Sequence, residues 1–229
     1  MKLPQGAREV ERVTLEKAGY PDRLLVLWMV RPEENPTGYD PEDPYTCPDH
    51  TRGSFYSGPT RVSLVDAKTG ALLNTLEVRD PHDSSSDSLD VPYAIRKGFY
   101  YHVPGDPKAS EEAKPVLLDL KDVNGDGKAA EFVLFDALNC MVLRTTLIGY
   151  SPAKDKVVNY PVRLKTTFDG KPDTLVTRWP DHLFHEKPER PGHWVYAVDY
   201  RGRGGSLDRY EVRYVPEKEE FEGTLVQMP

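Results

Sequence analysis

The chain of 229 residues carries 30 basic and 37 acidic side chains, so its net charge at pH 7 is −7. This acidic balance disfavours a nucleic-acid binder, which needs a broad cationic surface. The longest apolar run, residues 24–30, is far shorter than the roughly 18 residues of a membrane span. The 17 glycines and 21 prolines disfavour long helices, because proline lacks an amide donor and clashes with the preceding turn. The composition therefore predicts a globular protein of short strands and many loops.

Three apolar runs predict buried strands, and each is followed by a predicted hairpin. The runs are residues 24–30, 131–136 and 193–200, and the hairpins are residues 61–78, 146–162 and 210–226. In every hairpin, the last apolar residue before the turn lies seven positions before the first apolar residue after it. These pairs are Val65 and Leu72, Tyr150 and Val157, and Tyr214 and Phe221. The intervening Asp, Ser, Pro, Lys and Gly residues favour chain reversal.

The three strand-plus-hairpin units, at about residues 22–79, 115–164 and 192–227, indicate an internal repeat within a single domain of residues 1–229. The expected fold class is all-β, built from antiparallel hairpin repeats. Two architectures fit this spacing. One is an incomplete propeller, in which a fourth blade could lie in residues 79–120, and the other is a β-sandwich.

The segments between the repeats carry weaker signals. Short helical turns are expected near residues 8–17 and 180–187. The polar, acidic residues 80–90 predict a solvated connection. Aromatic side chains of the proline-rich insertion at 32–59, and Trp179 in a later loop, could stack on sugars. We expect them to pack inward beneath the loops instead.

One motif carries metal chemistry. Residues 122–128 read DVNGDGK, which matches the first half of the calcium loop D-x-[DN]-x-[DN]-G. Side-chain oxygens at alternate positions of such a loop converge when the chain curls, and the glycine permits a sharp turn that presents the next carbonyl. The expected Ca²⁺ ligands are the side chains of Asp122, Asn124 and Asp126 and the main-chain carbonyl of Lys128.

The second half of this loop departs from an EF-hand. Val133 stands where an EF-hand has a bidentate glutamate, and Glu131 is the nearest carboxylate that could complete the ligand shell. The flanking residues predict strands instead of helices, so the expected role of calcium is to staple the connection between two strands. The alternative is a metal-free turn, because Asn-Gly and Asp-Gly both favour tight turns.

Residues 116–135 resemble a calcium loop of the FG-GAP and VCBS repeat proteins. In those families D-x-N-G-D-G joins two strands, commonly in a propeller blade of a secreted or surface protein. The resemblance implies Asp122, Asn124 and Asp126 as side-chain ligands and Lys128 as a carbonyl ligand. Those families usually place their closing acid one residue earlier than Glu131, so this chain departs from their pattern there. Those families repeat the motif in several blades, whereas this chain has it once.

The cysteines and histidines leave alternatives open. Cys47 and Cys140 could form a disulfide in an oxidising compartment, worth about 4 kcal/mol for so long a loop, or they could be two unrelated thiols. His182 and His185 could share one face of a helical turn and bind a transition metal, and His193 follows a Pro-Gly turn. Surface or capping histidines are the simpler interpretation. The nucleophile motif G-x-S-x-G, a P-loop and a dinucleotide fingerprint are absent from the sequence.

Together these features predict a calcium-stabilised β-repeat module of a bacterial protein, secreted, periplasmic or exposed at the cell surface after removal of a signal peptide. A cytoplasmic location is the alternative. The expected role is non-enzymatic: binding a protein or glycan partner, a structural role, or self-assembly into a homo-oligomer through open strand edges. The alternative function is a secreted hydrolase with a carboxylate or histidine site on the long loops.

Overall fold

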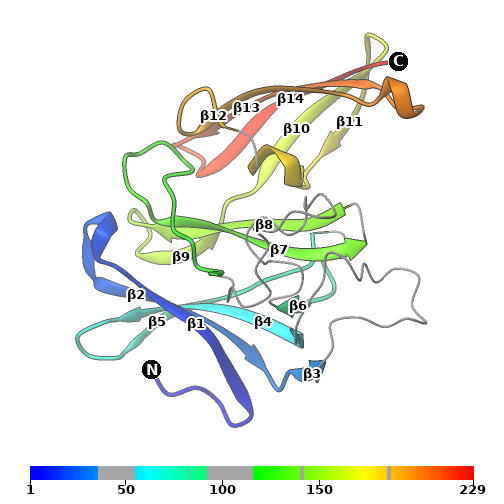
Figure 1. Cartoon of the computed structure of the whole chain (residues 1–229). Helices are drawn as coiled ribbons and strands as arrows, with labels where there is room; N and C mark the ends of the chain where they lie inside the picture. The colour runs from blue at the N-terminus through cyan, green and yellow to red at the C-terminus, as the bar shows by residue number, and fades with distance from the viewer. Residues whose placement is uncertain (36–54, 82, 92–115, 140–141, 185–186) are drawn as a thin grey trace, which may run out of the picture. The chain divides into compact units, whose positions relative to one another are not determined.

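A computed structural model describes residues 1–35, 55–81, 83–91, 116–139, 142–184 and 187–229. Regular structure in these ranges consists of strands and three short 3-10 turns, so the all-β prediction is confirmed (Figure 1). No helix in the described ranges is long and apolar enough to cross a membrane.

The chain divides into two compact units. Unit 1 comprises Met1–Asp119 and Phe132–Asn159, and unit 2 comprises Leu120–Glu131 and Tyr160–Pro229. The single-domain organisation expected from the sequence stays a prediction, and each unit is described by itself below.

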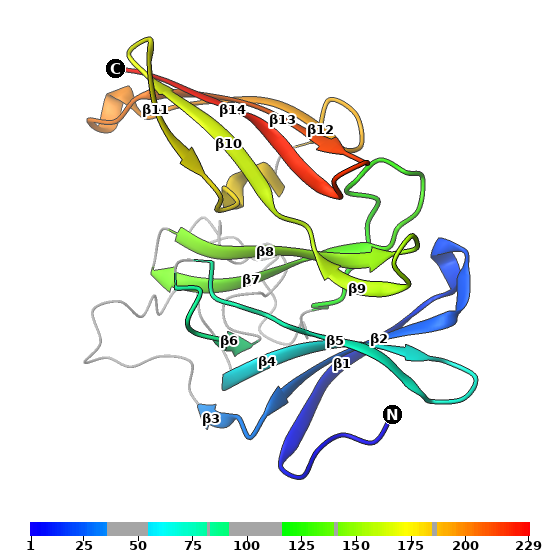
Figure 2. The ribbon, with the colours of Figure 1, turned by 180° about the vertical axis from the view of Figure 1, so that it is seen from behind.

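Unit 1 contains a six-stranded and a three-stranded sheet, formed by β1 to β9. Their bounds are β1 (Ala7–Leu15), β2 (Tyr20–Val30), β3 (Glu33–Asn35), β4 (Phe55–Asp66), β5 (Leu72–Glu77), β6 (Ser88–Val91), β7 (Glu131–Asn139), β8 (Val142–Ser151) and β9 (Lys156–Asn159). The larger sheet has the order β1-β2-β4-β3, with β5 and β6 also paired to β4, and the smaller has the order β7-β8-β9 (Figure 2). Contacts of β9 with β4 and β5 join the two sheets.

Strand β2 is buried on both faces, as its apolar run predicts. Leu25, Leu27 and Met29 are fully buried on one face. On the other face, Val26 and Trp28 pack against N-terminal residues of unit 1. The continuous apolar composition of β2 therefore accounts for its burial on both faces.

The helical turn expected near residues 8–17 is wrong for most of its length. Residues Ala7–Leu15 form β1, which pairs antiparallel with β2, and only Glu16–Ala18 form the 3-10 turn η1. Charged residues three and four apart resemble a helix surface here, but the free edge of β2 satisfies the backbone of β1. In addition, the Glu11 carboxylate accepts hydrogen bonds from the amides of Leu117 and Leu118, at 2.8 and 3.2 Å.

All three predicted hairpins form, and in each the predicted pair of apolar residues lies directly opposite. The observed pairs are Val65 with Leu72, Tyr150 with Val157, and Tyr214 with Phe221. The preceding apolar strand joins each hairpin, which gives the three-stranded units β2-β4-β5, β7-β8-β9 and β12-β13-β14. The sheets of the described residues are open, so an incomplete propeller and a β-sandwich both remain compatible with them.

The three hairpin turns also share a backbone conformation. The residue five positions after the first member of each pair has a positive φ, namely +71° at Gly70, +49° at Asp155 and +52° at Glu219. A left-handed residue is common where a short hairpin loop rejoins the second strand. The turns therefore match in conformation as well as in length.

Unit 2 contains one five-stranded sheet with the order β11-β10-β14-β13-β12 (Figure 1). The bounds are β10 (Val162–Phe168), β11 (Lys171–Val176), β12 (His193–Asp199), β13 (Leu207–Val215) and β14 (Glu220–Met228), with 3-10 turns η2 (Asp181–Phe184) and η3 (Arg201–Arg203). The pairing of β10 with β14 is parallel, whereas the sequence predicts antiparallel hairpins throughout. Parallel neighbours lie far apart in sequence, so no local turn signal reports them.

One face of the unit 2 sheet covers an aromatic core. Trp179, Trp194 and Phe221 are buried, and Trp179 lies 5.0 Å from Phe221 between ring centroids. The Trp179 indole N–H donates to the Tyr160 carbonyl at 3.0 Å. The inward packing expected of Trp179 is confirmed, and so is the helical turn near residue 180, which is η2. The alternate residues of the strands face outward.

Candidate functional site

The candidate calcium loop lies wholly in unit 2, and its two ends are paired. Lys121 and Glu131 form an isolated antiparallel bridge, with amide-to-carbonyl distances of 2.7 and 3.1 Å. Val123 and Ala130, next to these ends, are buried. The loop therefore begins and ends on fixed backbone, which restricts the nine residues between its ends.

Within the loop, the predicted ligand side chains fold back onto the backbone. The two carboxylate oxygens of Asp122 accept hydrogen bonds from the amides of Gly125 and Gly127, at 2.8 and 3.0 Å. Asn124 Oδ1 accepts from the amide of Asp126 at 2.9 Å. Asp126 in turn accepts from the amide of Lys128 at 2.8 Å. These bonds curl residues 122–128, as the spacing of the motif predicts.

Both glycines of the motif have left-handed backbones, with φ of +82° at Gly125 and +84° at Gly127. Side chains other than glycine adopt this conformation only at a cost. The calcium-loop pattern accounts for Gly127, the sixth position, and the Asn-Gly turn preference accounts for Gly125. The structure supplies a second reason at Gly125, where a Cβ would lie 2.5 Å from the Pro191 carbonyl oxygen.

The loop packs backbone to backbone against the turn that precedes β12. A Cβ at Gly192 would lie 2.4 Å from the Asn124 carbonyl oxygen, the reciprocal of the contact at Gly125. Gly192 also has a positive φ, +76°. His193 follows, with its Nδ1 2.9 Å from a Glu189 carboxylate oxygen. The calcium motif is thus in contact with the segment that contains His193, which no sequence pattern indicates.

Glu131 is buried and acts as an anchor for the start of the loop. Its Oε2 accepts from the amides of Val123 and Asn124 at 3.0 and 3.3 Å, and its Oε1 accepts from the Asn124 side-chain amide at 3.1 Å. Burial raises the pKa of Glu131 to about 8, and the negative charges of Asp126 and Asp122 add to the increase. The two backbone hydrogen bonds oppose it.

The donor set fits a hard cation in its chemistry. Asp122, Asn124 and Asp126 offer carboxylate and amide oxygens, each of which can accept a further interaction beside its backbone hydrogen bond. Among the described residues, no group of three or more His, Cys, Asp or Glu side chains is placed to hold a metal. A calcium shell here would therefore depend on Asn124 and the Lys128 carbonyl beside the two aspartates. Glu131 differs from them because it is fully buried and its two oxygens share three hydrogen bonds from Val123 and Asn124.

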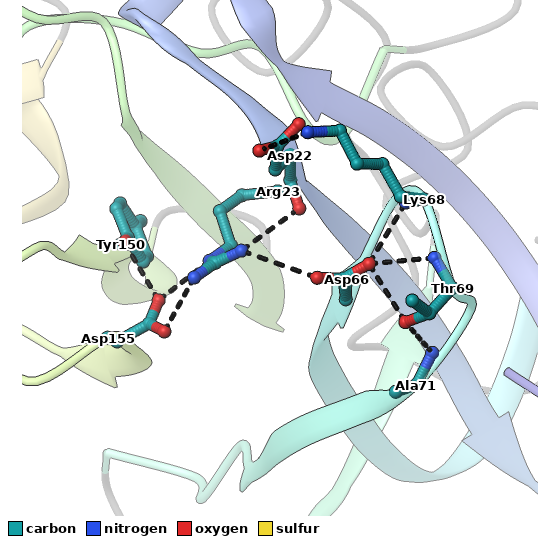
Figure 3. Close-up of polar contacts among 8 residues, drawn as sticks. All are labelled: Asp22, Arg23, Asp66, Lys68, Thr69, Ala71, Tyr150 and Asp155. Atoms are coloured by element: carbon teal, nitrogen blue, oxygen red, sulfur yellow. Dashed lines mark hydrogen bonds and ion pairs between the residues drawn. The ribbon is translucent and has the colours of Figure 1, made fainter.

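A second polar network, which the sequence does not predict, joins two corresponding hairpin turns in unit 1 (Figure 3). Arg23 of β2 donates from Nε and Nη2 to the two carboxylate oxygens of Asp155, both at 2.7 Å. Its Nη1 lies 3.7 Å from Asp66. Asp155 lies in the turn between β8 and β9, and Asp66 begins the turn between β4 and β5. One arginine thus links the turns of the first two repeats.

This network shifts the protonation equilibria of its members. The hydrogen bond from Arg23 lowers the pKa of Asp155, and the hydrogen bond from the Tyr150 hydroxyl, at 2.8 Å, acts in the same direction. The pKa of Arg23 is raised by the same hydrogen bond. Asp66 accepts from the amides of Lys68 and Thr69, which lowers its pKa and fixes its turn. These shifts describe structural ion pairs that stay charged near neutral pH.

Another ionic cluster in unit 1 is buried. Asp136 of β7 is 1% exposed and pairs with Arg144 of β8, which also donates to Asp80 at 2.7 Å. Burial raises the pKa of Asp136 well above its usual range, and Arg144 opposes this. The solvated connection expected for residues 80–90 is wrong at its two ends, because Asp80 is buried and Ser88–Val91 form β6, whereas residues 83–85 between them are exposed. The acidic composition of this segment predicts that Asp80 is solvated, but Arg144, which is distant in the sequence, compensates its charge in the interior.

The remaining sequence candidates are not tested by the described residues. Cys47, Cys140 and His185 lie outside them, as do residues 94–103 of the fourth-blade hypothesis. His182 belongs to η2, but nothing of its side chain is described. The disulfide, the transition-metal site and the hydrolase alternative therefore stay predictions.

No protein-family model matches the sequence. Neither a curated protein nor a solved structure matches it. The resemblance of residues 116–135 to FG-GAP and VCBS loops accordingly stays a prediction, and the function is argued below from the residues themselves.

Proposed function

We propose that the chain is a calcium-stabilised β-repeat module with a binding or structural role in a secreted or surface-exposed protein. The observation that carries the proposal is the curl of residues 122–128, in which Asp122, Asn124 and Asp126 each bond to the backbone through an oxygen that can accept again. Because three alternate side chains of one loop bond to its backbone in this way, their oxygens are held close to one another.

The charges of the loop support the same proposal. Burial is the main cause of the raised pKa of Glu131, and the negative charges of Asp126 and Asp122 add to it. When bound, Ca²⁺ would supply compensating charge and a cross-link between side chains of one loop. Asp122, Asn124, Asp126 and the Lys128 carbonyl would hold it, while Glu131 positions the Val123 and Asn124 amides. With two carboxylates in the ligand set, the affinity should be low, and extracellular modules bind calcium at about 10⁻⁴–10⁻³ M.

Thermal unfolding with calcium and with EGTA tests the proposal. At about ten times its Kd, calcium should stabilise the protein by about 1.4 kcal/mol and raise its Tm by about 3–6 °C. Asp126→Asn should abolish the increase. Glu217→Gln is the matched control, because Glu217 is an exposed carboxylate of unit 2 outside the loop. The proposal fails if wild type and Asp126→Asn respond equally to calcium.

If the role of the module is structural, we propose that copies of the chain associate through the edges of their sheets. Within unit 2, β11 and β12 are the outer strands of the sheet. Val195 of β12 is 60% exposed and Leu175 of β11 is 46% exposed. Unpaired strand edges are templates for pairing with another copy. Light scattering should then show association that increases with concentration, and a constant monomer mass would exclude it.

A further inference from the structure

The outer face of the unit 2 sheet carries a groove of about 840 Å³. Strands β10, β11, β13 and β14 and the β13–β14 turn form it. Its charged lining consists of four cations and two acids, so it is net positive in a chain of net charge −7. The cations are Arg163, Lys165, Arg213 and Lys218, and the acids are Glu211 and Glu222. A groove of this volume is large enough for a small organic ligand or a segment of a polymer.

The register of the sheet fixes the order of these charges. Arg163 of β10 lies opposite Glu222 of β14, and Glu222 lies opposite Arg213 of β13. The two arginines are therefore two strand spacings apart, about 10 Å between their backbones. Lys165, two residues along β10, lies opposite Thr224. The floor of the groove thus alternates cationic and acidic or neutral positions across the strands.

Among the described residues, three of the groove's cations form no close ion pair, although the charge of Arg213 helps to lower the pKa of its neighbour Glu222. Arg163, Lys165 and Arg213 make no ion pair or side-chain hydrogen bond with any residue in the described ranges. Lys218, in contrast, pairs with Glu222. Elsewhere in the protein, arginines such as Arg23 and Arg61 bond to carboxylates. Arginines left unpaired on one face of an acidic protein are available to an anionic ligand.

The acid between the arginines restricts that ligand. Glu222 would repel a chain with a charge at every unit, and single-stranded nucleic acid carries one charge per about 3.4 Å. A ligand with spaced acidic groups can instead place one near Arg163 and another near Arg213. An acidic peptide is less suited, because extended peptides bind by adding to a sheet edge, and the groove lies across the sheet face.

The uncharged residues of the groove favour a ligand that carries hydroxyl groups between its acidic groups. Thr174 and Thr224 are exposed, and their hydroxyls can each donate and accept a hydrogen bond. Pro172 and Leu175 supply an aliphatic wall. The described residues that line the groove include no aromatic ring, so neutral sugars would lack the stacking that usually holds them. Charge must then supply the affinity.

We propose that this groove binds an acidic oligosaccharide whose carboxylates alternate with neutral, hydroxyl-bearing sugars, one carboxylate near Arg163 and the next near Arg213. The inference rests on the binding role proposed above and names its ligand class. It does not depend on calcium, because the lining residues all lie outside the loop at 120–131.

Calorimetric titration with a hyaluronan hexasaccharide, which carries one carboxylate per disaccharide, tests the proposal. The hexasaccharide should bind, with an affinity that decreases as salt increases, and the neutral chitohexaose should not. Arg163→Ala and Arg213→Ala should each weaken binding by about tenfold or more, the usual effect of losing a charged hydrogen bond. Glu222→Gln should strengthen it. Lys17→Ala removes the same charge from an exposed site of unit 1 and should have no effect.

Each outcome is decisive. Absence of hexasaccharide binding, equal binding of chitohexaose, or equal affinities of the wild type and both arginine variants would overturn the proposal. Tighter binding of a hexaglutamate peptide would replace the glycan with a protein ligand. Since Arg163 and Arg213 are exposed, their variants should keep the wild-type Tm, which excludes misfolding. Titrations in EGTA separate the two proposals: binding without any calcium response of the Tm refutes only the calcium site.

Discussion

The contact between the candidate calcium loop and the Pro191–Gly192 turn can be measured with two glycines of one loop. Gly125 and Gly127 have nearly equal φ, +82° and +84°. A Cβ at Gly127 would meet nothing within 4 Å, whereas a Cβ at Gly125 would lie 2.5 Å from the Pro191 carbonyl oxygen. Alanine at each position therefore adds the same backbone strain, and only at Gly125 does it add a steric clash.

The expected magnitudes follow from these two terms. A left-handed conformation costs an alanine about 1–2 kcal/mol, so Gly127→Ala should lower the free energy of unfolding by about that amount. At Gly125 the clashing atom is main-chain oxygen, which no rotamer change can move. Separating the two turns should cost a further 1–3 kcal/mol or so, as overpacking of a fixed site typically does. Gly125→Ala should then destabilise by roughly 2–5 kcal/mol.

Urea unfolding followed by tryptophan fluorescence would measure both variants. Trp179 and Trp194 are buried in unit 2 and report on its unfolding. Gly170→Ala is the control outside the loop, because Gly170 has φ of +72° and open space around its Cβ position. It should match Gly127→Ala. Equal destabilisation by Gly125→Ala and Gly127→Ala would refute the backbone contact between the two turns.

Two further predictions concern ionisable groups. In EGTA, the free energy of unfolding should decrease as pH rises from about 4.5 to about 8, by up to about 5 kcal/mol, because folded Glu131 keeps a proton that the unfolded chain releases. Glu131→Gln should remove this slope, and an unchanged slope would assign it to other groups. In unit 1, Arg23→Ala should cost about 1 kcal/mol, and a double-mutant cycle with Asp155→Asn should show coupling. Zero coupling energy would mean that the ion pair contributes nothing to stability.

Local features of the fold could be predicted from the sequence because their determinants are neighbours in the chain. Turn residues and the seven-residue spacing gave the pairs Val65 with Leu72 and Tyr214 with Phe221. Continuous apolar composition gave the burial of β2 on both faces. The curl of residues 122–128 likewise depends on side chains two to five residues from the amides they bond. In each case the interacting groups lie within one window of the sequence.

The features that the sequence did not reveal depend on distant partners. The parallel pairing of β10 with β14 joins segments about sixty residues apart, and Arg23 bonds to an aspartate 132 residues away. Likewise, Asp80 is buried because Arg144 compensates its charge. The acidic composition of residues 80–90 could not indicate this, since it predicts exposure to solvent. The contact at Gly125 belongs to this class, since nothing near residue 125 indicates the turn at residue 191.

The three hairpin turns show how a repeated element comes to differ in role. All three place a left-handed residue at the same position, but only the first uses glycine there. The strain of an aspartate at position 155 is offset by bonds from Arg23 and Tyr150. In the third turn, Glu219 takes this position, and the turn's lysine, Lys218, pairs with Glu222 at the rim of the groove. The second turn is thus held by an arginine from β2, whereas the lysine of the third turn pairs with Glu220 and Glu222 of its own hairpin.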